Sequence, residues 1–286
     1  MSFIRLIPTL SLKDGRIIKT IGFDRYRDVG HPSTMGKVYD SQDVDELIFA
    51  DITASQEVRD PDWQNIKLFA EHCNMPLTMG GGISSIEDIN RYLSFGADKI
   101  ILNSFAIENP NFIQEAASTF GSQCVVVSID CKQISNGSYE VMSCGGIKKT
   151  GRKPVDWAID CVRLGAGEIL VTSIDREGSF EGYDIDLVKS VCEVVKVPVV
   201  ANGGAGLLCD LIDVVQQTSV SGVACSSIFS FTDNIKSCFS IRLVFKYLFI
   251  KNFIASDALL VSSGSPLIVI EFPLKNILVL VNFSNS

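Results

Sequence analysis

Three polar side chains stand at the ends of apolar runs, where they could carry out chemistry. Ser11 follows the run IPTL, and Asp51 and Asp130 end the runs LIFAD and VVVSID. A carboxylate can give and take a proton near neutral pH once its surroundings tune its pKa. A serine hydroxyl needs an adjacent base, and the candidates nearby in sequence are Lys13 and Lys19. Because a serine at a strand end usually donates a hydrogen bond, we expect Ser11 to contact a ligand and not to act as a nucleophile.

Two sets of small residues could bind phosphate. In each set a glycine pair follows one apolar run, and a pair of Asn or Ser residues follows the next. Glycine lets backbone N–H groups approach an anion, and a following helix N-terminus adds a favourable dipole. Two such sets predict a ligand with a phosphate at each end. Asp175 and Gly178, in the loop after residues 168–173, are added to the two sets. The predicted phosphate-binding residues are therefore Gly81, Gly82, Asn103, Ser104, Asp175, Gly178, Gly203, Gly204, Ser226 and Ser227.

The sequence of the first half of the predicted barrel recurs in its second half. The stretch PLTMGGGIS at Pro76 resembles PVVANGGAG at Pro198, a shift of 122 residues. The same shift brings Glu46 onto Glu168, and a shift of 119 brings IPTLSLK onto VVSIDCK. Apolar strands of the first half therefore recur in the same order in the second half, which indicates an internal duplication.

The elements that must position these residues are short apolar strands that alternate with amphipathic helices. The strands show no alternation of polar and apolar residues, as expected when both faces are buried. Helical spacing covers residues 84–96, 153–165 and 185–195. The predicted strands are 4–10, 46–51, 76–80, 98–102, 123–129, 168–173, 198–202 and 221–226.

Eight such β-α units predict a (β/α)8 TIM barrel with an internal half-barrel duplication. The alternative is a doubly wound open sheet, but the sequence has no G-x-G-x-x-G turn, and the duplication favours the barrel. Active sites of barrels lie at the C-terminal ends of the strands. Ser11, Asp51, Asp130 and the phosphate-binding residues all fall at such ends.

Composition excludes several classes of function. The net charge of the 286 residues is −8, which argues against a broad surface for nucleic acid or an anionic membrane. The nine cysteines form no C-x-x-C pair, and His31 and His72 are far apart, so we expect neither a metal site nor a disulfide framework. The N-terminus MSFIRLIPTL lacks the features of a signal peptide. We expect a cytoplasmic protein without a cofactor.

The stretches KDGRIIKT, DELIFADITAS, MGGGI, GADKIILNS, GAGEILVTSIDREG and NGGAG follow one another in the first 230 residues. In these motifs the chain resembles the histidine biosynthesis barrels, which include the cyclase subunit of imidazole glycerol phosphate synthase and the phosphoribosyl-formimino isomerase. The resemblance to the cyclase subunit implies that ammonia attacks a bisphosphorylated phosphoribulosyl-formimino aminoimidazole carboxamide ribotide and that imidazole glycerol phosphate is formed. It also implies a heterodimer with a glutaminase subunit, whose ammonia would travel along the barrel axis.

The resemblance implies roles for single residues at the barrel mouth. The family uses two aspartates, at the ends of strands 1 and 5, as general acid and base. Asp130 fits the second position, whereas Ser11 stands at the first. Lys19 matches the family's strand-1 lysine, and Asp51 its strand-2 aspartate, both predicted to be catalytic. With one proton-transfer partner missing, we expect ring closure to be slow.

The resemblance also implies a gate at the opposite end of the barrel. Arg5, Glu46, Lys99 and Glu168 stand at strand starts with alternating charge, where the family guards its ammonia channel. Asp98 fits an acidic residue that faces the glutaminase. The alternative is a solvated ring of charges that contributes little.

The serine at the first catalytic position leaves two other functions open. Relatives encoded with bacterial surface-polysaccharide genes also lack the strand-1 aspartate, and they supply ammonia for the amidination of a sugar. This chain could be such an ammonia-transfer subunit. It could also be a non-catalytic subunit that only binds and activates a glutaminase.

Residues 236–286 form a separate segment in this interpretation, after a barrel domain of residues 1–235. The segment is rich in Ile, Leu, Val and Phe, but Lys, Arg, Asp and Pro interrupt it too often for a bilayer span. Its pattern predicts a closing helix followed by two short strands. The segment is either an addition that pairs with a partner or a tail whose sequence results from a shifted reading frame.

Overall fold

The computed structural model describes residues 4–41, 44–134, 137–226 and 228, and the backbone of 267–272 and 277–282. The chain divides into two compact units, Met1–Tyr247 and Leu248–Ser286. In the second unit, β13 (Leu267–Phe272) and β14 (Ile277–Asn282) form an antiparallel pair, in agreement with the two predicted strands. The predicted closing helix and the predicted boundary at 235 lie outside the described residues.

The first unit contains a closed barrel of eight parallel strands. Their order is β10-β11-β12-β1-β4-β5-β6-β7, and pairing of β10 with β7 closes the ring. Both ends of each strand lie within two residues of the predicted ends, except for the C-terminal ends of β1 and β7. The strands are β1 (Arg5–Lys13), β4 (Leu47–Asp51), β5 (Leu77–Gly80), β6 (Lys99–Leu102), β7 (Val125–Gln133), β10 (Glu168–Ser173), β11 (Val199–Asn202) and β12 (Gly222–Cys225). The predicted (β/α)8 barrel is confirmed.

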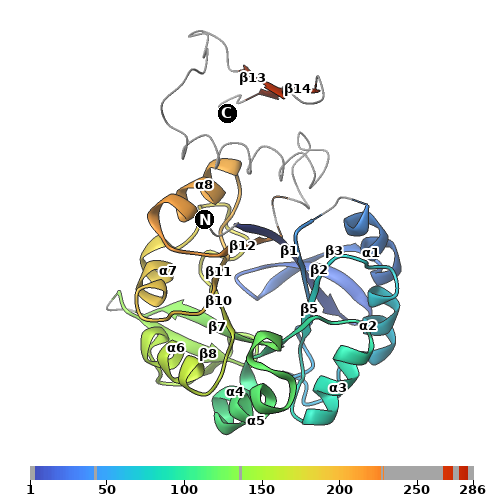
Figure 1. The fold of residues 1–286 in the computed structure, drawn as a ribbon, viewed down its shortest axis with the longest axis vertical. Helices are drawn as coiled ribbons and strands as arrows, with labels where there is room; N and C mark the ends of the chain where they lie inside the picture. The colour runs from blue at the N-terminus through green and yellow to red at the C-terminus, as the bar shows by residue number, and fades with distance from the viewer. Residues whose placement is uncertain are drawn as a thin grey trace. The chain divides into compact units, whose positions relative to one another are not determined.

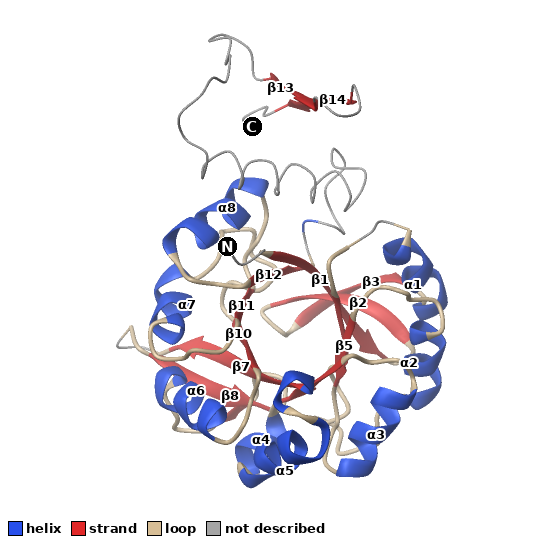
Figure 2. Ribbon diagram, viewed as in Figure 1, coloured by secondary structure: helices blue, strands red, loops and turns tan. Residues whose placement is uncertain are grey.

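Helices surround the ring of strands on the outside (Figures 1 and 2). Their starts follow local sequence signals: Ser85 caps α3 in a capping box with Asp88, and Pro154 begins α6. The helices are α1 (Pro32–Asp40), α2 (Trp63–Ala70), α3 (Ile86–Ser94), α4 (Ser104–Glu108), α5 (Asn111–Phe120), α6 (Pro154–Arg163), α7 (Ile185–Cys192) and α8 (Leu208–Gln217), with the short 3-10 helix η1 (Ser122–Cys124). No helix of the described part of the chain is long and apolar enough to cross a membrane.

In each half, the first strand continues beyond the C-terminal end of the barrel into a hairpin. In the first half, β1 continues into β2 (Arg16–Ile21), which pairs with β3 (Arg25–Gly30). In the second half, β7 continues into β8 (Tyr139–Ser143) and β9 (Lys148–Lys149).

The turn between β1 and β2 explains why β1 is longer than predicted. Asp14 and Gly15 both have positive φ, and Lys13 pairs with Arg16 across them. An Asp-Gly pair in a two-residue hairpin is a strong local signal, because both positions need the left-handed region. Ser11 therefore lies within a strand, paired with Ala50 on one side and Ile18 on the other.

The strand registers confirm the duplication. Ser11 pairs with Ala50 between β1 and β4, and Asp130 pairs with Thr172 between β7 and β10. These are the pairs that the shifts of 119 and 122 residues superimpose. Ser11 and Asp130 thus occupy equivalent positions in the two halves.

Candidate active site

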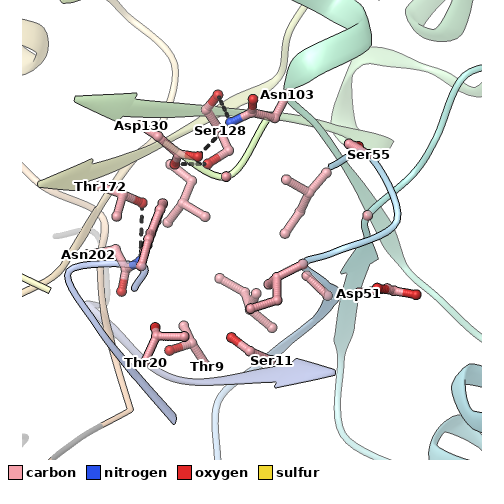
Figure 3. Close-up of a pocket in the computed structure, with 18 of the residues that line it drawn as sticks. Thr9, Ser11, Thr20, Asp51, Ser55, Asn103, Ser128, Asp130, Thr172 and Asn202 are labelled. Carbon is pink, nitrogen blue, oxygen red and sulfur yellow. Dashed lines mark hydrogen bonds between the residues drawn. The ribbon is translucent and has the colours of Figure 1, made fainter. Parts of the chain in front are cut away.

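A cavity opens at the C-terminal ends of the barrel strands, where the fold class places active sites. Both halves contribute polar side chains to it, as Figure 3 shows. Its lining includes Ser11, Lys19, Asp51, Gly81, Gly82, Asn103, Ser104, Ser128, Asp130, Thr172, Glu177, Asn202 and Ser226.

Hydrogen bonds from two side chains hold the carboxylate of Asp130 in the cavity. Ser128 Oγ donates a hydrogen bond to its Oδ1 at 3.0 Å, and Asn103 Nδ2 donates to its Oδ2 at 2.8 Å. Burial raises the pKa of Asp130 to about 6, against the opposing effect of hydrogen bonds from Ser128, Thr172 and Asn103. A carboxyl group with a pKa near neutrality suits general acid–base catalysis, because it can both release and accept a proton.

Ser11 lies across the cavity from Asp130 (Figure 3). It is half-buried and shares this side of the cavity with Thr9 and Thr20. Ser11 lines the cavity, and its predicted contact with a ligand stays a prediction. The two equivalent strand positions therefore present a hydroxyl on one side and a carboxylate on the other.

Asp51 reaches the rim of the cavity but is held by its own loop. Its carboxylate accepts hydrogen bonds from Arg59 at 2.8 and 3.0 Å and from the backbone N–H groups of Thr53, Ala54 and Asp62. Figure 3 shows this carboxylate turned away from Asp130 and Ser11. These contacts fit a role in positioning the β4–α2 loop, and the catalytic role that the resemblance implies for Asp51 stays a prediction.

Lys19 lies on β2 of the hairpin, beyond the barrel strand to which the resemblance assigned it. Its ammonium group pairs with Glu177, and Thr20 Oγ1 donates to the same carboxylate at 2.9 Å. All three side chains are buried. Burial lowers the pKa of Lys19 to about 8.

The first predicted phosphate set lines the cavity completely, with Gly81, Gly82, Asn103 and Ser104. The backbone also needs these glycines, because a Cβ on Gly81 would lie 2.0 Å from the carbonyl oxygen of Asp51.

The second set reaches the cavity only in part. Ser226 lines it, and Ser227 lies outside the described residues. Gly203 and Gly204 have positive φ and serve close packing, since Cβ atoms there would lie 2.7 and 2.0 Å from the carbonyl oxygens of Ser173 and Gly182. They do not line the cavity.

Two further predicted residues also lie away from this cavity. Asp175 accepts a hydrogen bond from the backbone N–H of Gln133 at 2.7 Å and lines a separate hollow. Gly178 packs against β2, where a Cβ would lie 2.6 Å from the carbonyl oxygen of Thr20. The phosphate-binding role of these two residues, like that of the second set, stays a prediction.

Four charged side chains form a closed ring at the N-terminal ends of the strands. Glu46 accepts hydrogen bonds from Arg5 at 2.5 Å and from Lys99 at 3.0 Å. Glu168 pairs with Arg5 and, at 2.7 Å, with Lys99. Burial acts to raise the pKa of Glu46, but Lys99 and Arg5 outweigh it and lower the pKa overall. The predicted gate residues are thus brought together in alternating charge.

Asp98 lies beside this ring but has a local use of its carboxylate. It is exposed, and it accepts a hydrogen bond from the backbone N–H of Leu77 at 2.8 Å. Its predicted contact with a partner remains a prediction.

An apolar layer separates the charged ring from the cavity. Successive interior residues of a strand are two apart, so Ile7, Ile48, Ile101 and Leu170 follow the four ring residues by two positions. They belong to one buried cluster that also contains Val126, Val200 and Ala224. The barrel axis therefore passes from a charged ring through an apolar layer into a polar cavity.

Sequence reasoning missed several polar residues of the cavity. Ser128 and Thr172 belong to predicted strands, and their alternation with Asp130 and Leu170 could have placed them inside. Glu177 lies in the stretch SIDREG, four residues after the end of the predicted strand 168–173. No group of metal-ligating side chains was found among the described residues.

Comparison with known proteins identifies the family of this barrel. Residues 5–236 match the family described as histidine biosynthesis protein. The chain is 46% identical over 228 residues to the imidazole glycerol phosphate synthase subunit HisF of Lactococcus lactis subsp. cremoris (strain MG1363), covering 79% of this chain and 88% of that protein. It is 44% identical over 227 residues to the HisF of Streptococcus gordonii, covering 79% and 90%. The chain belongs to the histidine biosynthesis protein family.

Proposed function

We propose that this chain is a cyclase subunit of the imidazole glycerol phosphate synthase type. Relatives that are about 45% identical to this chain carry that name, and the match covers most of their length. The observation that carries the proposal is the axial order of a charged ring, an apolar layer and a polar cavity built around Asp130. Ammonia is small and neutral, so an apolar layer is less of a barrier to it than to an ion.

The cavity side chains have distinct parts in this reaction. The phosphoribulosyl-formimino aminoimidazole carboxamide ribotide has a phosphate at each end, which Ser104 and Ser226 would bind on the two sides of the cavity. Asp130 takes up and releases protons as ammonia adds and the imidazole ring closes. Asn103 and Ser128 orient its carboxylate and keep it ionised against the effect of burial.

The partner in this proposal is a glutaminase subunit bound as a heterodimer at the N-terminal ends of the strands. The relatives are named as a subunit of a synthase, which supports a complex. Ammonia would enter through the ring of Arg5, Glu46, Lys99 and Glu168. Asp98, exposed beside Lys99, would contact the partner.

The serine at position 11 is the one observation that favours a second candidate function. A cavity with a hydroxyl at this position could pass ammonia to a different acceptor, such as a sugar to be amidinated. The charged ring and the apolar layer would serve both reactions.

Complementation of a histidine auxotroph that lacks its cyclase subunit tests the proposal. Growth without histidine, together with turnover of the purified chain on the ribotide with ammonium salt, is the expected result. Failure of both assays with folded protein would exclude the histidine-pathway reaction. Stimulation of a glutaminase without any turnover would then support a non-catalytic subunit.

A further inference from the structure

A buried tyrosine behind the first predicted phosphate set has no part in the mechanism above. Tyr92 lies on α3, and its hydroxyl donates to the carbonyl oxygens of Gly80 at 2.9 Å and of Gly81 at 2.8 Å. The side chain is fully buried. Burying a hydroxyl costs free energy that its hydrogen bonds only offset, and a phenylalanine would fill the same space without that cost. The hydroxyl is therefore a candidate for a role beyond packing.

The contact with Gly81 sets the direction of the peptide group that follows it. Gly81 lies beyond the end of β5, outside the strand pairs that fix the carbonyl groups of a sheet. The peptide bond between Gly81 and Gly82 is trans, and in a planar trans peptide the C=O and the N–H point in opposite directions. With the carbonyl held toward α3, the N–H of Gly82 points away from this helix. Gly82 lines the cavity.

The N–H of Gly82 is available to a ligand. Among the described residues, none accepts a hydrogen bond from it. Backbone N–H groups in folded proteins are almost always paired with protein groups, water or a ligand, so an unpaired one beside a cavity points to a bound acceptor. Ser104 of the same set also lines this cavity. A backbone N–H and a hydroxyl are both suitable donors to a phosphate oxygen.

We propose that Tyr92 is a positioning residue of the first phosphate set. Its hydroxyl holds the Gly81 carbonyl, so that the N–H of Gly82 stays directed at the phosphate that Ser104 binds. The inference rests on the proposed function, because it takes this set to bind one phosphate of the ribotide. It adds a residue that does not itself line the cavity.

The surroundings of Tyr92 keep the hydroxyl in place and protonated. The ring of Trp63 packs edge-on against the tyrosine ring, with the centroids 5.0 Å apart. Burial raises the pKa of Tyr92 well above its ordinary value, and the charges of Asp51 and Asp88 act in the same direction. The hydroxyl therefore remains a hydrogen-bond donor at every pH at which the carboxylates of the cavity titrate.

The second half has no counterpart of this hydroxyl. The shift of 122 residues places Val214 of α8 at the position of Tyr92. In this half the carbonyl oxygen of Gly204 accepts a hydrogen bond from the backbone N–H of Gly182 at 2.9 Å. Gly203 and Gly204 do not line the cavity, whereas both glycines of the first set do. The glycine pair that lines the cavity is thus the pair anchored by the tyrosine.

The test compares variants of the full chain by steady-state kinetics with ammonium salt and varied ribotide. Tyr92→Phe removes the hydroxyl and keeps the ring. Tyr183→Phe is the matched control, because Tyr183 is also buried and its hydroxyl donates to a backbone carbonyl, that of Ala224, at 2.9 Å. Ala224 lies within β12 and pairs with both neighbouring strands, so its peptide is fixed without the hydroxyl. Urea unfolding establishes that both variants are folded.

Tyr92→Phe should raise KM for the ribotide about fivefold or more, with kcat changed less than about twofold. The reason is that a phosphate held equally before and during the reaction contributes to binding and not to the chemical step. Tyr183→Phe should leave KM within about twofold of the wild type.

A double-mutant cycle locates the effect at one phosphate. Tyr92→Phe combined with Ser104→Ala should raise KM by less than the product of their separate factors, because both residues act on the same phosphate. Tyr92→Phe combined with Ser226→Ala should give the full product, because Ser226 belongs to the other set.

A measurement without turnover follows the Gly82 amide directly. Addition of inorganic phosphate should shift the Gly82 N–H resonance in the NMR spectrum of the wild type. In Tyr92→Phe the same shift should need about fivefold more phosphate or more. In Tyr183→Phe it should follow the wild type.

Several results would overturn the inference while leaving the proposed function in place. They are an unchanged KM in Tyr92→Phe, an equal rise of KM in Tyr183→Phe, independent factors for Tyr92→Phe and Ser104→Ala, or an unchanged phosphate titration of Gly82. Absence of turnover in the wild type is a different outcome, because it contradicts the proposed function itself. The phosphate titration would then still decide whether Tyr92 positions Gly82.

Discussion

The two halves of the barrel share a backbone but differ at the mouth. Ser11 on β1 and Asp130 on β7 have equivalent strand registers, yet one offers a hydroxyl and the other a carboxylate with a pKa raised to about 6 by burial. At the other end, Glu46 and Glu168 are also equivalent, and both remain carboxylates in the same ring. The duplicated backbone thus fixes where side chains lie, while the residue types decide separately at each pair of equivalent positions whether the chemistry is the same.

The largest expected effect comes from neutralising one member of the equivalent pair. Asp130→Asn should lower ammonia-dependent turnover by roughly 100- to 10,000-fold, because it removes a general acid–base while keeping the shape of the side chain. Steady-state kinetics with ammonium salt would measure this, and binding of the ribotide should change little.

Ser11→Ala is the matched control at the equivalent position. A neutral hydrogen bond contributes only about 1 kcal/mol, so this variant should lose no more than about fivefold. Equal losses in Asp130→Asn and Ser11→Ala would show that the two halves are chemically alike, contrary to the comparison above.

A second comparison separates the two phosphate sets. Ser104→Ala in the first half and Ser226→Ala in the second should each weaken binding of a bisphosphorylated ligand roughly 10- to 100-fold, since hydrogen bonds to charged groups contribute about 1.5–3 kcal/mol. Isothermal titration calorimetry would measure the dissociation constants.

The hydroxyls are better targets than the glycines of these sets. A Cβ on Gly82 or Gly204 would clash with Ala54 or with the backbone of Gly182, so such variants would also strain the fold. If only Ser104→Ala weakened binding, the second set would not bind phosphate, and the symmetric prediction would fail.

The third prediction concerns the charged ring, where each half contributes one glutamate, Glu46 or Glu168, at equivalent positions. Both cations, Arg5 and Lys99, come from the first half. Lys99→Met should leave ammonium-dependent turnover within about twofold, because the ring lies beyond the apolar layer from the cavity, and should change glutamine-dependent turnover severalfold. Paired assays of the complex with each nitrogen source would measure the ratio, and an unchanged ratio would argue against a gate.

The fold was predictable from sequence because its signals are local and repeated. Unbroken apolar runs gave the barrel strands, and the recurrence of PLTMGGGIS as PVVANGGAG gave the half-barrel repeat. The hairpin extension is not predicted, although the pair Asp14-Gly15 signals its turn, because the predicted first strand ends at Leu10.

The site was less predictable, because its contacts join distant parts of the chain. Lys19 meets Glu177 across 158 residues, and no local pattern shows that contact. Asp51 could be placed at a strand end, but its engagement by Arg59 depends on the path of the loop. Glycine pairs have the same sequence signature whether they bind phosphate or only allow close packing, as Gly203 and Gly204 show.

The smallest expected effect is a pH dependence of the unfolding free energy. Asp130 confers it because its carboxyl group titrates, and Ser11 does not because its hydroxyl does not titrate in this range. Burial raises the pKa of Asp130 to about 6, above its value of 3.8 in the unfolded chain. The folded state therefore favours the protonated form. This contribution to stability is fully present below the unfolded value, and it is lost as pH rises through the folded pKa. The complete shift corresponds to about 3 kcal/mol, of which about 1 kcal/mol falls between pH 5 and pH 7.

Urea unfolding of the wild type and of Asp130→Asn at pH 5, 6 and 7 would measure this contribution. Asn does not titrate, so the unfolding free energy of the wild type minus that of the variant should fall by about 1 kcal/mol across this range. Ser11→Ala, at the equivalent position, should show a difference from the wild type that is independent of pH. A constant difference for Asp130→Asn as well would mean that Asp130 titrates as an ordinary carboxyl group. The contrast between the two halves would then lie in their residue types alone and not in the environment that the barrel provides.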